Sequence, residues 1–187
     1  DVLARFARGL GVGEGTDLND EALLLGACHR PPFEKGARSL ALGDKGTVFV
    51  GNRNLSDVYA IVDRGGKREV KKILTGLKAP NGVAFSKGTL FVAERHRITR
   101  YDGIEDRLDN PPEAKVVIDN LDPSTQAGHF WKFLALGPDG KLYFNIGAPG
   151  NIVMPSYMEA SIMRVDMKGT LETVALGTRS EGREAAR

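Results

Sequence analysis

Hydrophobic and polar residues alternate in short runs along this chain, and the runs form a pattern that occurs three times. In each repeat, two apolar strands are joined by a turn that contains glycine, at residues 39–50, 82–92 and 133–144. Glycine supplies the positive φ that a tight turn between antiparallel strands requires. Two more strands follow in each repeat, at 58–63 and 69–74, 97–102 and 114–119, and 162–166 and 171–176. The pattern therefore predicts three units of four antiparallel strands.

The spacing of these units indicates how they assemble. Ala41, Ala84 and Ala135 occupy equivalent positions, so the period is about 43 to 51 residues, which is the range of β-propeller blades. Helical periodicity is missing between residues 38 and 176, which favours an all-β fold. We predict a propeller-like fold of about three four-stranded blades, half of a six-bladed propeller, with a β-sandwich as the alternative.

The first 35 residues follow a different pattern. Val2, Leu3, Phe6 and Leu10 recur at helical spacing, and a glycine-rich stretch comes after them. Those glycines match neither the dinucleotide-binding pattern nor the Walker pattern, so they favour a linker over a phosphate site. We expect a helical or irregular N-terminal arm at 1–35, three blades at 36–179 and a tail at 180–187.

The composition excludes several classes of protein. With 41% hydrophobic residues and a formal net charge of +2, the chain has the composition of a globular domain. No apolar run approaches the roughly 18 residues of a membrane-spanning helix. The single cysteine, Cys28, forms no internal disulfide. The basic residues within 64–72 and 95–100 lack interleaved aromatic residues, so we interpret both groups as solvated faces and expect no nucleic-acid partner.

Four segments carry a resemblance to a known family: GARSLALGDKGTVFVG, APNGVAFSKGTLFVAERHRITRYD, GHFWKFLALGPDGKLYFNIGAPGN and ASIMRVDMKG. Together they resemble the sorbosone/glucose dehydrogenase family, whose members are soluble six-bladed quinoproteins. The resemblance covers residues 36–179 and matches the N-terminal half of such a propeller. It implies oxidation of an aldose or aldehyde by hydride transfer to pyrroloquinoline quinone (PQQ), in the periplasm or outside the cell.

The resemblance also implies roles for particular residues. His129 matches the family's general base, and an imidazole suits that task because its ordinary pKa of about 6.5 lets it accept a proton near neutral pH. Arg179 resembles an arginine that contacts the quinone, because a planar guanidinium fits carboxylates. Ser180 stands where the family has asparagine. Lys132 is the second residue expected to bind the cofactor.

Three further residues are expected to contact the substrate, namely Asn81, Trp131 and Asn145. Asn81 precedes the first strand of the second blade, where the family lines its substrate pocket. An asparagine before glycine is also typical of a turn, and in gluconolactonase-type propellers a similar one binds calcium. Trp131 offers a face for stacking on a quinone or a sugar, or for packing between blades. We expect no metal ligands among these residues, while calcium remains a candidate cofactor.

Three blades do not close into a ring, because closed propellers have about four to eight. We therefore expect either a homodimer of two three-bladed halves or a missing second half. The expected small-molecule partner is a sugar or an aldehyde. Two other functions stay open: a non-catalytic propeller fragment that serves as a binding or assembly module, and a calcium-dependent lactonase. Whether the chain is an enzyme is likewise open.

Overall fold

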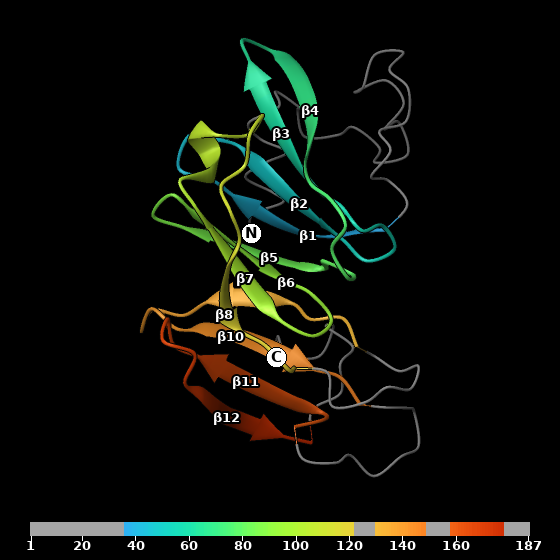
Figure 1. Ribbon diagram of the computed structural model, residues 1–187, viewed down its shortest axis with the longest axis vertical. Helices are drawn as coiled ribbons and strands as arrows, with labels where there is room; N and C mark the ends of the chain where they lie inside the picture. The colour runs from blue at the N-terminus through green and yellow to red at the C-terminus, as the bar shows by residue number, and fades with distance from the viewer. Residues whose placement is uncertain (1–35, 122–129, 149–157, 178–187) are drawn as a thin grey trace, which may run out of the picture. The chain divides into compact units, whose positions relative to one another are not determined.

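The computed structural model describes residues 36–121, 130–148 and 158–177. Three four-stranded antiparallel sheets make up this part of the chain (Figure 1). Sheet 1 consists of β1 (Ala37–Leu42), β2 (Val48–Asn52), β3 (Val58–Arg64) and β4 (Lys67–Leu74). Sheet 2 consists of β5 (Gly82–Ser86), β6 (Thr89–Ala93), β7 (Ile98–Asp102) and β8 (Lys115–Ile118). Sheet 3 consists of β9 (Leu134–Leu136), β10 (Leu142–Ile146), β11 (Ser161–Val165) and β12 (Leu171–Leu176). A short 3-10 helix, η2 (Ile104–Asp106), lies between β7 and β8.

This architecture confirms the predicted all-β fold of three propeller blades. Consecutive strands are neighbours in every sheet, whereas a β-sandwich would divide its strands between two packed sheets. Observed strand ends lie within one or two residues of the predicted ones; β4, for example, begins at Lys67 rather than at residue 69. The predicted arm at 1–35 and tail at 180–187 lie outside the described residues, so the domain boundaries stay predictions.

Sheet 2 packs against both other sheets, because side chains alternate between the two faces of a strand. Leu90 and Val92 of β6 join an apolar cluster with sheet 1. Phe91 and Ala93 of the same strand join a second cluster with sheet 3. Two apolar interfaces therefore hold the three blades together.

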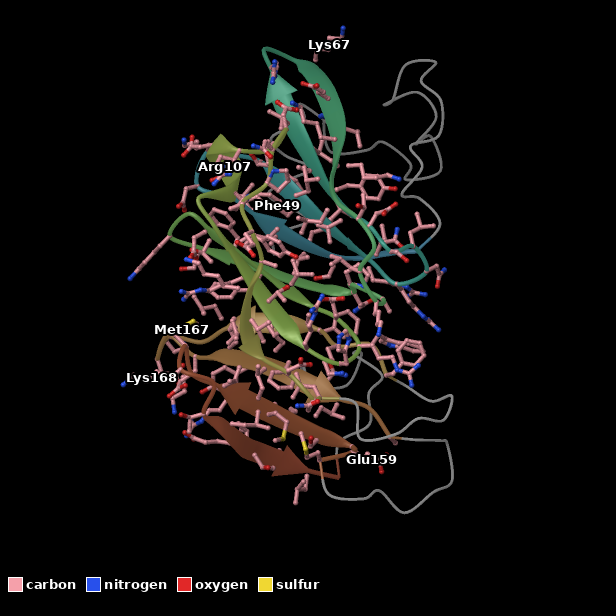
Figure 2. The ribbon with its side chains drawn as sticks, in the orientation of Figure 1. Phe49, Lys67, Arg107, Glu159, Met167 and Lys168 are labelled. Atoms are coloured by element: carbon pink, nitrogen blue, oxygen red, sulfur yellow. The ribbon has the colours of Figure 1, made fainter. Side chains whose placement is uncertain are left out.

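The first of these interfaces contains a stacked aromatic pair. Phe49 of β2, labelled in Figure 2, is fully buried. Its ring lies 5.3 Å from that of Phe85 of β5, centroid to centroid. In the second interface, Leu142, Phe144 and Ile146 of β10 face sheet 2. The alternation that predicted the strands thus also selects the faces that meet between blades.

The connections between strands lie at two opposite ends of the blades. The connections at 43–47, 87–88, 137–141 and 166–170 lie at one end, which we call the turn end. The segments 53–57, 75–81, 94–97 and 130–133 lie at the opposite end, which we call the loop end; it is on the right in Figure 1. No helix among the described residues is long and apolar enough to cross a membrane.

Candidate functional site

The predicted site residues that the structure describes all lie at the loop end. Asn81 immediately precedes β5, Trp131 and Lys132 precede β9, and Asn145 lies near the end of β10. Because the sheets are antiparallel, the start of β9 and the end of β10 are adjacent. His129 and Arg179 lie outside the described residues, so their predicted roles stay predictions.

Backbone hydrogen bonds from two blades fix the segment that leads to Asn81. The N–H of Asn52 donates to the carbonyl of Pro80 at 2.9 Å, and the N–H of Arg95 donates to the carbonyl of Lys78 at 2.8 Å. The first bond comes from sheet 1 and the second from sheet 2. Ala79, between these anchors, has a φ of 49°, a left-handed conformation that such external bonds help to maintain.

A buried carboxylate adds a third anchor. Glu94 is 1% exposed, and its Oε2 accepts a hydrogen bond from the N–H of Lys78 at 2.8 Å. Its Oε1 accepts one from Nε of Arg97 at 2.5 Å, and this bond raises the pKa of Arg97. The interpretation of the basic residues at 95–100 as a solvated face is therefore wrong for Arg97, because its guanidinium neutralises a buried charge.

Asn81 is fully buried, and its amide is fixed on one side only. Its Nδ2 donates to the carbonyl of Lys132 at 3.0 Å, a bond that joins sheet 2 to the segment before sheet 3. Its Oδ1 is buried and has no hydrogen-bond partner among the described residues. An unpaired buried acceptor costs free energy, so Oδ1 is suited to accept from a small donor such as water or to contribute to a cation site.

Lys132 lies inside the protein, with 2% of its surface exposed. Its ammonium donates to the carbonyl of Arg95 and to that of Phe130, the latter at 3.3 Å. These bonds fix the segment 130–132 against the β6–β7 loop. As placed, Lys132 therefore positions its neighbours, and the predicted direct contact with a cofactor stays a prediction.

Two arginines lie on an aromatic pair at the loop end. Cζ of Arg53 is 3.5 Å from the centroid of the Trp131 ring, and Cζ of Arg95 is 4.5 Å from that of Phe130. The two aromatic rings meet edge to face, with centroids 5.3 Å apart. A ring face attracts a cation through its negative quadrupole.

Asn145 supports the same segment from β10. Its Oδ1 accepts from the N–H of Phe133 at 2.7 Å, and its Nδ2 donates to the carbonyl of Trp131 at 3.4 Å. Both ends of its amide are thus used within the protein. The structure gives Asn145 a positioning role, and its predicted contact with substrate stays a prediction.

Planar cationic and aromatic groups lie together at this end. Its guanidinium and aromatic planes match a flat molecule that carries carboxylates, which is the chemistry of PQQ. No group of three or more His, Cys, Asp or Glu side chains that would hold a metal occurs within the described ranges. Arg53 covers one face of the Trp131 ring, so a quinone or a sugar does not stack on that face in this arrangement.

Sequence reasoning did not identify Arg53 and Arg95 as parts of this arrangement. Arg95 is interpreted from the sequence as one of several solvated strand-end charges, and its contact with Phe130 corrects that interpretation. Arg53 and Trp131 come from different sheets, so no local motif signals their contact. The only local signal is a position: each arginine follows the second strand of its blade.

Comparison with known proteins identifies the fold and leaves the family open. No protein-family model matches the chain, and no curated protein matches its sequence significantly. Among solved structures, the chain is similar to the PQQ domain of pyranose dehydrogenase from Coprinopsis cinerea, with 15% identity and a TM-score of 0.58. That match covers 70% of this chain and 33% of the other.

Two more solved structures are similar over a comparable length. An enzyme of carbohydrate-active family AA12 from Trichoderma reesei, in a calcium structure, has 17% identity and a TM-score of 0.56, covering 71% of this chain and 36% of that one. A gluconolactonase from Xanthomonas campestris has 20% identity and a TM-score of 0.52, covering 76% and 49%. The shared feature is the β-propeller fold. This chain spans about a third to a half of the length of these structures.

Proposed function

We propose that the chain forms part of a PQQ-dependent oxidoreductase that acts on a sugar or an aldehyde, in the periplasm or outside the cell. One observation carries the proposal: the segment after His129 is fixed at the loop end by buried contacts with sheet 2. The amide of Asn81 and the ammonium of Lys132 make these contacts. A catalytic base needs a rigid support of this kind, because its reach to the substrate must be held within a narrow range.

The proposed roles follow from the chemistry of each group. When bound, PQQ supplies an acceptor for the hydride. His129 accepts the proton of the substrate hydroxyl, and Arg179 pairs with a carboxylate of the cofactor. Lys132 and Asn145 hold the segment 130–133 in place through its backbone groups. Asn81 presents Oδ1 as an acceptor.

A titration with PQQ in the presence of calcium tests this function on the full chain. We expect saturable binding, and reduction of a dye by aldoses that is lost in His129→Ala while PQQ still binds. The exposed turn-end variant Lys168→Ala serves as the matched control and keeps both properties. Absence of PQQ binding up to high micromolar concentration would contradict the proposal. Calcium-dependent opening of a lactone, without PQQ binding, would favour the lactonase.

The alternative role in assembly has its own supporting observation, the apolar outer face of sheet 1. Val48, Val50 and Tyr59 form a buried cluster on the face that points away from sheet 2. Beside them on β1, Leu40 is 42% exposed and Leu42 is 59% exposed. Large exposed apolar side chains that adjoin an apolar cluster are typical of a protein contact.

Light scattering tests the expected homodimer. We expect a mass of twice 20.2 kDa at micromolar concentration, and a shift toward the monomer in Leu42→Ser. The control Val116→Ser removes a side chain of similar exposure from β8 of sheet 2. A single mass of 20.2 kDa for the unaltered chain would contradict the dimer.

A further inference from the structure

The position of Arg53 is fixed from two directions. Arg53 directly follows β2, and its backbone N–H donates to the carbonyl of Gly36, just before β1, at 2.8 Å. The preceding side chain, Asn52, is fully buried, and its Oδ1 accepts from the N–H groups of Asn54 and Leu55 at 2.9 Å each. The turn that carries Arg53 is therefore rigid before any ligand binds, which lowers the entropy lost on binding.

The guanidinium of Arg53 is stacked, and no described residue accepts a hydrogen bond from it. At 3.5 Å from the Trp131 centroid, the group is in van der Waals contact with the ring. Its side chain makes no ion pair or hydrogen bond with any residue in 36–121, 130–148 or 158–177. A guanidinium carries five N–H donors in one plane, so stacking holds that plane while leaving its edge available.

A second positive charge lies across the aromatic pair. Arg95 stacks on Phe130, whose ring meets Trp131 edge to face. The buried carboxylate next to it in the sequence, Glu94, is already engaged by Arg97 and by the N–H of Lys78. Glu94 therefore does not neutralise the two stacked arginines.

We propose that Arg53, held on Trp131, binds the carboxylate of an anionic sugar, so that the substrate class is an aldose that carries a carboxylate, as a uronic acid does. The edge of the guanidinium forms two parallel N–H···O bonds with the carboxylate. The aromatic pair provides an apolar surface for the sugar ring. The identity of the ligand as a substrate rests on the proposed dehydrogenase function, whereas the anion site itself does not.

Calorimetric titration of the full chain without PQQ tests the site. D-glucuronate and D-glucose are a matched pair of probes, because they differ only in a carboxylate in place of a hydroxymethyl group. Trp131 is the single tryptophan, so its fluorescence locates the binding event beside Arg53. We expect glucuronate to bind at least about 10-fold more tightly than glucose, the size of one charge-assisted contact.

Three variants identify the group that is responsible. Arg53→Leu is expected to remove the preference for glucuronate. Arg53→Lys is expected to lose most of it, because an ammonium keeps the charge without the planar edge. Arg107→Leu, at an exposed arginine near η2, is the control and keeps the preference (Figure 2).

Each alternative outcome separates this inference from the dehydrogenase proposal. Equal affinities of the unaltered chain for glucuronate and glucose would overturn the inference without any variant. If Arg53→Leu weakens PQQ binding and leaves glucuronate binding unchanged, the carboxylate belongs to the cofactor and the inference also fails. If glucuronate binding depends on Arg53 but no dye is reduced with PQQ, the anion site stands and the dehydrogenase function fails.

Discussion

At the scale of single residues, Glu94 determines how two loops of the site meet. Its carboxylate is the acceptor for a backbone N–H in the 75–81 segment and for the guanidinium of Arg97. A buried charge is tolerated only when it is paired and hydrogen-bonded, and both conditions hold here. The side chain of Glu94, directly after β6, thus anchors Lys78, the residue before the strained Ala79.

Substitutions of Glu94 are expected to destabilise the protein in a graded way. Glu94→Ala leaves a backbone N–H without its acceptor, with an expected loss of about 2–4 kcal/mol in the free energy of unfolding. Glu94→Gln keeps that acceptor and loses only the charge, with an expected loss of about 1–2 kcal/mol. Urea unfolding at neutral pH measures both. The exposed control Glu113→Ala is expected to change stability by less than about 0.5 kcal/mol.

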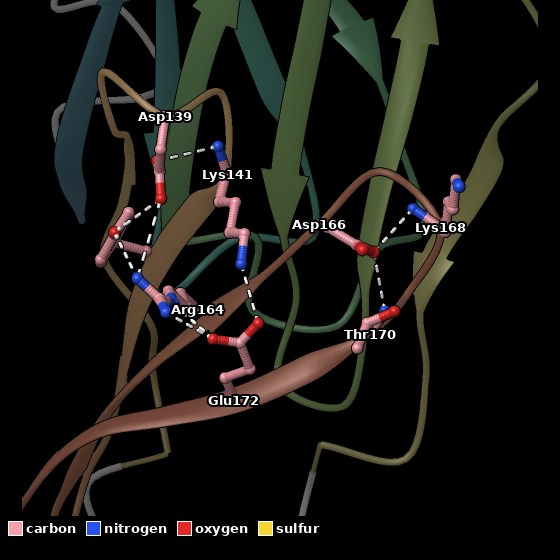
Figure 3. A network of polar contacts seen from close by, with 8 residues as sticks. Asp139, Lys141, Arg164, Asp166, Lys168, Thr170 and Glu172 are labelled. Atoms are coloured by element: carbon pink, nitrogen blue, oxygen red, sulfur yellow. Dashed lines mark hydrogen bonds and ion pairs between the residues drawn. The ribbon is translucent and has the colours of Figure 1, made fainter.

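At the scale of elements, a polar network on the outer face of sheet 3 joins β12 to its neighbours (Figure 3). Nε of Arg164 on β11 donates to Oε2 of Glu172 on β12 at 2.7 Å, and Nζ of Lys141 donates to Oε1 at 2.8 Å. Asp166 closes the tight turn between β11 and β12, because its Oδ1 accepts from the N–H of Lys168 and of Thr170. Because β12 pairs with β11 alone among the described strands, these contacts supplement its single ladder.

This network predicts an acid-dependent loss of stability. The hydrogen bond from Lys141, and then that from Arg164, lower the pKa of Glu172 below its ordinary value of 4.5. Since the folded pKa is the lower one, the stabilisation is fully present above pH 4.5 and is lost as the pH falls through the folded pKa. Melting temperatures between pH 7 and 3 are expected to fall less steeply below pH 4.5 in Glu172→Gln than in the unaltered chain.

A matched variant keeps this test specific. Glu113→Gln removes an exposed carboxylate from the segment before β8, outside the network. Its melting temperatures are expected to follow those of the unaltered chain across the same range. If Glu172→Gln and Glu113→Gln give the same profile, the network does not contribute to acid sensitivity.

At the scale of the whole molecule, two glycines allow the blades to approach closely at the loop end. A Cβ on Gly51 would lie 2.3 Å from the carbonyl oxygen of Asn81, and a Cβ on Gly82 would lie 2.6 Å from that of Lys132. Neither glycine has a positive φ, so close approach and not backbone conformation explains them. The first contact joins sheet 1 to the segment before sheet 2, and the second joins sheet 2 to the segment before sheet 3.

Gly51→Ala is therefore expected to destabilise the packing between blades. The added methyl group meets backbone, which cannot move aside as a flexible side chain can, so we expect a loss of about 2–3 kcal/mol. Gly66→Ala, in the open β3–β4 turn at φ 87°, is the control and loses only the strain of about 1 kcal/mol for a left-handed residue. Denaturant unfolding separates the two. Equal losses would show that close approach is not the cause.

The sequence by itself determined the strands, their order and the three-fold repeat. Alternation and turn glycines are local properties, and local backbone preferences act on neighbours in the chain. It also located Asn81, Trp131, Lys132 and Asn145 at one end of the blades, because strand connectivity fixes which connections share an end. Repeat length and strand count were therefore enough to predict the architecture.

Only the tertiary structure decided which side chains meet. The amide of Asn81 reaches a carbonyl 51 residues away, and Arg53 reaches the ring of Trp131 from a different sheet. The burial of Glu94 and Lys132 likewise depends on how neighbouring blades pack. The physical reason is that charge pairing and stacking depend on distances of a few ångströms between segments far apart in sequence. Such distances are set by the packing of whole sheets, on which local periodicity carries no information.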